Sequence, residues 1–395
     1  MSGSIVNMYD KTVYALSLQT NAMARLQEQA STGSRVNRAS DAPSDAYRIL
    51  GLSTQERTLG NYQESIGDLS GVLQSSSTIL SNMDGRLTEM VTLLTQISGG
   101  VLGPDGPAKL ASTVNDTLEQ LISMANTKQG NQYLFGGNKT TAAPYVVEYT
   151  GGVISRVTYQ GGDEARDMEV ADAVQVEGYR VGDDVFRVDD RQAPEFLGQS
   201  GAANGTGTST VRGDTWLTVT YDGTNYQISI DDGATTVTVP AGGAANQAVT
   251  DSRTGRVLYV DTTGINSTGV ELVRVPGTYD VFNTLISLRD MLLNAQGISE
   301  QELLSNVNES VASVREVQAL LGQANTTIGL EINFLDQLKD SMENMQFDAQ
   351  DQRSYLQDAD IAEIAVDLSR FEVLYEMSLS IAGRLMSTSL LDFIR

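Results

Sequence analysis

"LGNYQESIGDLSGVLQSSSTILSNMDGRLTEMVTLLTQI", residues 59–97, repeats large apolar side chains at alternating steps of three and four residues. The positions of this series are Leu59, Tyr62, Ile66, Leu69, Leu73, Ser76, Leu80, Met83, Leu87, Met90, Leu94 and Ile97. Only Ser76 interrupts the apolar set. This spacing places one apolar stripe along a helix and is typical of a coiled-coil seam. Two glycines at 99–100, with prolines at 104 and 107, follow it and predict the helix end.

A second long helix is predicted near the other end of the chain. Its apolar positions also advance by three or four residues, and they are Leu304, Val307, Val311, Val314, Val317, Leu321, Ala324, Ile328, Ile332, Leu335, Leu338, Met342 and Met345. A shorter helix is expected over 109–128, forming an antiparallel hairpin with the first long helix. These helices predict a bundle built from both halves of the chain.

Between about Pro144 and Pro276 the pattern changes to alternation and turns. Apolar and polar residues alternate on either side of Asp222-Gly223 and Asp232-Gly233, which predicts an antiparallel β meander over 217–239. A Gly/Ser/Thr/Asn-rich stretch at 198–210 is expected to be a flexible connection. Arg212-Gly213-Asp214, a tripeptide that some cell-adhesion receptors bind, lies beside it and is an easy chance match.

The expected fold class is therefore α+β. It consists of a long antiparallel helical bundle or coiled coil built from both chain termini, with an inserted, mainly antiparallel β domain. We expect a terminal coiled-coil domain of residues 1–58 and 350–395, and a long-helix bundle domain of residues 59–143 and 278–349. The β domain would span 144–277, with two sub-parts divided near 198–212.

Composition narrows the possible functions. The chain has 395 residues and a net charge of −24, which disfavours binding to nucleic acid or to anionic membranes. Cys and His are both absent, which removes thiolate nucleophiles, the commonest general base and the usual zinc ligands. We expect no catalytic, cofactor-binding or metal-binding residues and no enzyme activity. A carboxylate-pair enzyme on the central insert is the alternative from another class.

The two ends of the chain carry heptad-like apolar spacing of their own, which predicts that the two terminal helices pair with each other. The C-terminal helix is also apolar on other sides, and one partner helix cannot cover so wide a surface. Other subunits are expected to cover it. The residues predicted to contact subunits or partners are Ile5, Tyr9, Val13, Leu16, Met23, Leu26, Arg35, Asn37, Ile361, Ile364, Leu368, Phe371, Tyr375, Ile381, Leu385, Leu390, Leu391, Phe393 and Ile394.

Three stretches support a family resemblance. "STGSRVNRASDAPSDAYRI", residues 31–49, resembles the signature shared by bacterial flagellins and flagellar hook-associated proteins. "GNQYLFGGNKTTAAPY" at 130–145 and "YDVFNTLISLRDML" at 279–292 look more like the hook-associated protein 3 family of hook–filament junction proteins than like flagellin. The ending "SLLDFIR", 389–395, is similar to the ending of that family. The resemblance covers roughly residues 1–145 and 278–395.

The resemblance implies a function. Proteins of this family are exported unfolded through the flagellar type III channel on an uncleaved N-terminal region, which suits the absence of a secretory signal. The chain is then expected to be a secreted, extracellular structural subunit that assembles with itself, with hook-associated protein 1 and with flagellin. A cytoplasmic export chaperone is a further expected partner. The alternative within the same superfamily is flagellin itself, the filament subunit.

Overall fold

The computed structural model describes the backbone of residues 2–98 and 106–393, and the side chains of residues 10–97 and 106–384. Internal contacts divide the chain into two compact units. The terminal unit consists of Met1–Glu64 and Gln337–Arg395, and the central unit of Ser65–Asp336. The predicted α+β class is confirmed, because both ends of the chain are helical and antiparallel strands lie between them. The finer three-part division remains a prediction.

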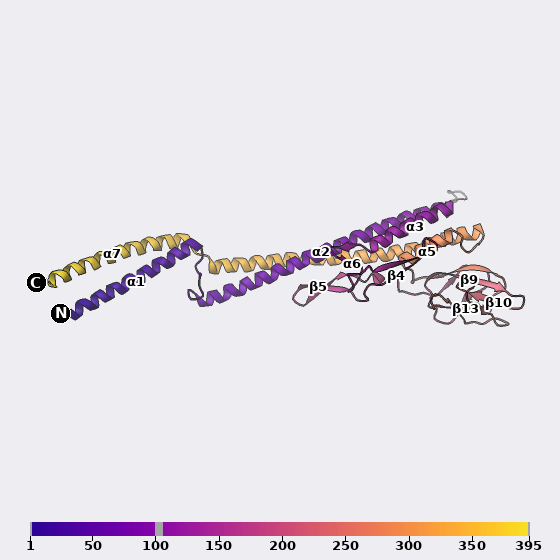
Figure 1. Cartoon of the computed structure of the whole chain (residues 1–395), viewed down its shortest axis with the longest axis horizontal. Helices are drawn as coiled ribbons and strands as arrows, with labels where there is room; N and C mark the ends of the chain where they lie inside the picture. The colour runs from indigo at the N-terminus through magenta and orange to yellow at the C-terminus, as the bar shows by residue number, and fades with distance from the viewer. Residues whose placement is uncertain (1, 99–105, 394–395) are drawn as a thin grey trace. The chain divides into compact units, whose positions relative to one another are not determined.

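Helices account for both ends of the chain (Figure 1). Their bounds are α1 Ser2–Thr32, α2 Pro43–Ser98, α3 Gly106–Ala125, α4 Gly182–Phe186, α5 Val281–Leu292, α6 Glu300–Gln357 and α7 Ile361–Phe393. The predicted series on the first long helix is buried in the central unit, where Leu69, Leu73, Leu80, Met83 and Leu94 have no exposed surface. Ser76 lies on the same buried face. Its polar side chain can be buried there because its hydroxyl donates a hydrogen bond to the carbonyl of Val72 at 3.0 Å.

Helices α2 and α6 are joined in the central unit by side-chain hydrogen bonds. Asn325 of α6 accepts from the hydroxyl of Ser77 at 2.6 Å and donates to that of Ser81 at 3.2 Å. Farther along, Gln318 donates to the hydroxyl of Thr88 at 2.9 Å. The long predicted seam of α6 is largely confirmed by burial at positions such as Val307, but Met345 is 48% exposed. In its place, Ala349 is buried.

The inserted region is built from short antiparallel strands. Their bounds are β1 Lys128–Gln129, β2 Gln132–Tyr133, β3 Tyr145–Thr150, β4 Val153–Tyr159, β5 Arg166–Ala171, β6 Val174–Tyr179, β7 Glu195–Phe196, β8 Ala203–Asn204, β9 Gly213–Tyr221, β10 Tyr226–Ser229, β11 Val237–Thr238, β12 Gln247–Thr250, β13 Val257–Asp261 and β14 Gly269–Val275. The predicted meander is confirmed as β9–β10–β11, within a five-stranded sheet of order β11-β10-β9-β14-β7. A three-stranded sheet of order β12-β13-β8 lies against it, and β1–β2, β3–β4 and β5–β6 are separate pairs.

The glycine-rich stretch at 198–210 is not the flexible connection that its composition suggested. It contains strand β8, which pairs with β13, and the amides of Gly205 and Thr210 donate to carbonyls of the same strand at 3.0 and 2.7 Å. Glycine is needed here for close approach. A Cβ on Gly207 would lie 2.4 Å from the ring of Tyr259.

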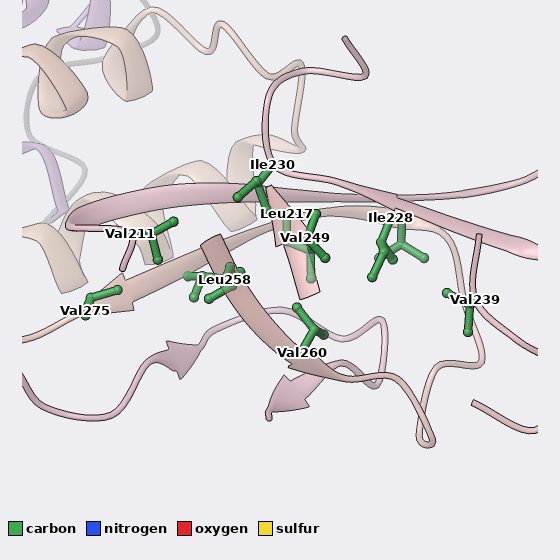
Figure 2. Close-up of a cluster of buried hydrophobic side chains, with 11 residues drawn as sticks. Val211, Leu217, Ile228, Ile230, Val239, Val249, Leu258, Val260 and Val275 are labelled. Carbon is green, nitrogen blue, oxygen red and sulfur yellow. The ribbon is translucent and has the colours of Figure 1, made fainter. Parts of the chain in front are cut away.

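One apolar cluster fills the space between the two larger sheets (Figure 2). Leu217 and Ile228 come from the five-stranded sheet, Val249 and Leu258 from the three-stranded sheet, and all four are fully buried. This two-layer packing gives the inserted region a core of its own.

A buried polar network attaches this β region to α6. The Tyr279 hydroxyl donates to the Asp214 carboxylate at 2.6 Å, and Arg274 donates to Tyr279 at 3.2 Å and to Ser313 of α6 at 2.9 Å. Burial, followed by the charge of Asp214, raises the pKa of Tyr279 well above its ordinary value. The Asp214 side chain is only 3% exposed. The Arg212-Gly213-Asp214 tripeptide is therefore committed to internal contacts and does not present its carboxylate to a receptor.

Replacing Leu217 with alanine should destabilise the β region by about 2–5 kcal/mol, because it leaves a cavity in a close-packed core. The chain has one tryptophan, Trp216 of β9, so its fluorescence during urea unfolding measures this transition. Leu197→Ala is the matched control, since Leu197 is 37% exposed and should change stability by less than about 1 kcal/mol. Equal shifts for the two variants would contradict the assigned core.

Candidate subunit interface

The terminal unit holds little buried apolar surface. Among the described side chains, only five of the 60 buried apolar residues belong to it: Val36, Leu59, Met342, Ala349 and Ile364. By contrast, it carries 15 of the 23 exposed large apolar side chains, although it has less than a third of the residues. A monomeric protein rarely leaves so much apolar surface in water. This surface is the candidate functional site.

Helices α1 and α7 pack along each other in the terminal unit (Figure 1). The seam on α7 follows the predicted spacing, with Ile364 buried and Leu368, Phe371, Tyr375, Ser378 and Ala382 half-buried. On α1 the predicted Leu16, Met23 and Leu26 are half-buried, and so are the polar Thr12 and Gln19 on the same side of the helix. Val13, which the sequence had placed in this seam, is 47% exposed instead. The pairing of the two terminal helices is therefore confirmed, with a polar component on α1.

A second stripe of exposed side chains, apolar except for Arg370, runs along another side of α7. We call it the outer stripe, and it consists of Val366, Val373, Leu374, Met377 and Ile381. Their exposed fractions are 69%, 56%, 39%, 56% and 52%. At about 100° per residue, these five residues fall within a sector of about 100° around the helix, whereas Leu368 and Phe371 lie outside that sector. Tyr14 and Leu18 of α1, at 66% and 52%, are also exposed.

The loop between α1 and α2 clamps the chain where α6 meets α7. Gly33 ends α1 with φ at +69°, a left-handed conformation that glycine adopts without strain. The amide of Arg35 then donates to the carbonyl of Gln357 at 2.6 Å, and the amide of Ala359 donates to the carbonyl of Gly33 at 3.0 Å. The hydroxyl of Ser34 also donates to Gln357, at 3.1 Å.

The two loop residues predicted to contact partners are engaged within the chain. The Arg35 guanidinium donates to the Asp45 carboxylate at 2.9 Å and to the Leu356 carbonyl at 2.8 Å. The Asn37 amide donates to the carbonyl of Ser34 at 3.1 Å. These contacts fix how α1, α2, α6 and α7 meet within the terminal unit. A partner role for Arg35 and Asn37 stays a prediction.

Several predicted interface residues have side chains outside the described part of the structure: Ile5, Tyr9, Leu385, Leu390, Leu391, Phe393 and Ile394. Of the others, Ile361 and Ile381 are each 52% exposed. Exposed apolar residues that the sequence did not single out are Tyr47, Leu50 and Tyr355, at 80%, 67% and 88%. These three residues follow no clear helical repeat, so their spacing in the sequence could not identify them.

Metal-binding clusters and membrane-spanning helices are absent from the described residues. Across residues 2–98 and 106–393, no group of three or more acidic side chains is placed to hold a metal ion. Over the same ranges, no helix has the length and apolarity needed to span a bilayer.

Comparison with known proteins agrees with this geometry. Residues 5–140 match the family model for the bacterial flagellin N-terminal helical region. Flagellar hook-associated protein 3 of Salmonella typhimurium strain LT2 is 28% identical over 167 residues, which cover 42% of this chain and 50% of that protein. The chain resembles flagellar hook-associated protein 3. The match spans about half the length of this curated relative.

Solved structures agree in fold. The crystal structure of flagellar hook-associated protein 3 from Legionella pneumophila is similar with a TM-score of 0.54 and 18% identity, over 78% of this chain and 98% of that one. A second crystal structure, of the flagellar junction protein from Legionella pneumophila, has a TM-score of 0.52 and 18% identity, over 78% and 99% of the two chains. At this identity the likeness establishes the fold. The resemblance inferred from the sequence motifs is confirmed.

Replacing Phe371 with alanine should loosen the α1–α7 pair, because Phe371 lies in its only described apolar seam. Losing half-buried aromatic surface costs about 1 kcal/mol, which corresponds to roughly fivefold faster amide exchange in both helices. Hydrogen exchange followed by mass spectrometry measures this effect in the purified monomer. The buried stretch 66–97 of α2 provides an internal reference, since it belongs to the other unit.

The control is Met377→Ala, which removes a side chain of comparable length from the outer stripe of the same helix. It should leave exchange in the monomer unchanged. Faster exchange for Met377→Ala than for Phe371→Ala would mean that the two sides of α7 have been assigned the wrong way round.

Proposed function

We propose that this chain is a structural subunit of the bacterial flagellum that forms the junction between the hook and the flagellin filament. Its terminal helices assemble with those of neighbouring copies. Its further partners are hook-associated protein 1 on the hook side and flagellin on the filament side. The protein acts outside the cell after type III export, with a cytoplasmic chaperone covering the C-terminal helix beforehand. It performs no catalysis.

The outer stripe is the observation that carries this proposal. Burying a side chain such as Val373 or Met377 contributes roughly 1.5–3 kcal/mol, so five such residues form a strong association surface. The clamp between residues 33–35 and 357–359 brings both ends of the chain together within one unit. The two terminal helices can therefore form one assembly surface within this unit.

The relatives favour a junction subunit over flagellin. The matched curated protein is named flagellar hook-associated protein 3, and a matched structure is that of a flagellar junction protein. The flagellin family model matches only the N-terminal helical region that both types of protein share. For these reasons flagellin is the weaker of the two candidate functions.

Deleting the gene should leave hooks intact and release flagellin into the medium, because the hook end and flagellin would no longer be joined. A gene that carries both Val373→Ser and Met377→Ser, introduced into the deletion strain, should restore export of the protein but not the filaments. The polar side chains reduce the free energy gained by burying the outer stripe. Electron microscopy of the cells and immunoblots of the medium measure both outcomes.

The matched control is the pair Ser369→Ala and Glu376→Gln, two exposed positions on the polar face of the same helix. This pair should restore filaments fully. Normal filaments in the deletion strain would refute the junction function. Filaments restored by the doubly polar stripe variant would refute only the role of the outer stripe.

A further inference from the structure

A partly open cavity of about 620 Å³ lies in the central unit, away from the helical seams. Its walls come from six separate stretches: the start of β3, β4, α4, the start of β9, the turn between β12 and β13, and the start of α5. A volume of this size is in the range of small-molecule sites. The subunit interface described above makes no use of it.

Positive charge is concentrated in this cavity. Five arginines line it, namely Arg156, Arg187, Arg212, Arg253 and Arg256, against the three carboxylates of Asp183, Asp214 and Asp280. The chain as a whole has 26 basic and 50 acidic residues, so a wall with more arginines than carboxylates reverses the overall balance. Random placement of so few basic residues would not favour such a cluster.

The three carboxylates are already committed to other groups. Asp214 accepts from the hydroxyl of Tyr279, and Asp183 pairs with Arg187 at 2.6 Å. Asp280 caps α5, accepting from the amides of Phe282 and Asn283 at 3.1 and 2.8 Å. Their capacity to neutralise further arginines is therefore largely used.

Arg256 has no such partner. Within the described part of the chain, no hydrogen bond or ion pair joins its guanidinium to a protein group. Partial burial, and next the nearby charge of Arg212, lower the pKa of Arg256, while Asp280 acts in the opposite direction. Arg187, Arg212 and Arg253 are ion-paired with Asp183, Asp189 and Asp232 at 2.6, 3.2 and 3.2 Å. Within the described residues, the charge left without an ion pair in this cavity is that of Arg156 and Arg256, which a bound anion would neutralise.

Unpartnered polar atoms are also concentrated here. Among the described residues, eight buried side-chain nitrogen or oxygen atoms lack a hydrogen-bond partner, and four of them belong to residues that line this cavity. These four are Nε of Arg187, Nη1 of Arg212, the hydroxyl of Tyr145 and Oγ1 of Thr284. Each can donate a hydrogen bond. Buried donors without acceptors are rare and costly in folded proteins.

We propose that this cavity binds a small oxyanion, a molecule carrying a phosphate or carboxylate group. Guanidinium groups bind both kinds of anion through paired N–H donors, and small rotations of Arg187, Arg212 and Arg256 bring their donors to a ligand. The hydroxyls of Tyr145 and Thr284 are covered in the unliganded chain, and they can add neutral donors once the surrounding side chains move around a ligand. The chain's net charge of −24 opposes unspecific anion binding elsewhere on its surface, so binding has to be local.

Isothermal titration calorimetry of the full-length monomer tests this proposal, with inorganic phosphate and citrate as probes and sodium chloride holding the ionic strength constant. At least one probe should bind with a stoichiometry of one. The probe that binds more tightly shows whether the cavity prefers a phosphate or a carboxylate group. Arg256→Gln should weaken binding by about tenfold or more, because it removes a charge-assisted contact. Tyr145→Phe should weaken it several-fold without loss of fold, because the hydroxyl it removes has no protein partner.

Arg86→Gln is the matched control. Arg86 lies on the exposed surface of α2 in the same unit, paired with Glu89 at 3.0 Å, and its loss should change binding by less than about twofold. Circular dichroism and Trp216 fluorescence should be the same for all variants. The proposal is overturned if neither probe binds up to about 10 mM. It is equally overturned if Arg256→Gln and Arg86→Gln bind the probe with the same affinity as the unchanged chain.

Discussion

Helix α7 is apolar on two sides, whereas α1 can cover only one of them. The seam with α1 takes Leu368, Phe371 and Tyr375, and the outer stripe keeps Val373 and Met377 more than half exposed. Because apolar surface is costly in water, we propose that another protein covers this stripe and completes the terminal unit. The clamp between Gly33–Arg35 and Gln357–Ala359 matters for the same reason, since it holds both terminal helices to one unit.

The central unit behaves in the opposite way. Its α2 seam is fully buried, its two larger sheets enclose a cluster around Leu217 and Leu258, and the Asp214–Tyr279–Arg274 network attaches the β region to α6. This unit therefore buries most of its large apolar side chains within one chain. Among its described residues, four of the six buried polar atoms without a partner belong to the arginine-lined cavity. This division, with most of the buried core in the central unit and most of the exposed apolar surface in the terminal unit, supports the proposed function as a subunit of a polymer.

Helix period was the most informative signal in the sequence. Steps of three and four residues gave the long seams of α2 and α6 and the seam of α7, because a buried stripe on a helix has few alternatives. On α1 the same rule chose Val13 over Thr12, since two neighbouring registers share Leu16, Met23 and Leu26. Composition suggested flexibility at 198–210, where the glycines instead permit close packing on Tyr259. The cavity could not be foreseen, because residues as distant as Tyr145 and Arg256 meet only in the folded β region.

The absence of cysteine makes the central claim directly measurable, because a single Val373→Cys variant carries the only thiol in the chain. The rate of its reaction with a maleimide can be compared between the purified monomer and flagella sheared from cells that carry the variant. If the outer stripe is an association surface, the thiol should react readily in the monomer and at least about tenfold more slowly in the assembled flagellum. A Glu372→Cys variant, at an exposed position about 100° around the helix from Val373, corrects for general crowding. Equal reactivity of the Val373→Cys thiol in monomer and flagellum would contradict the account.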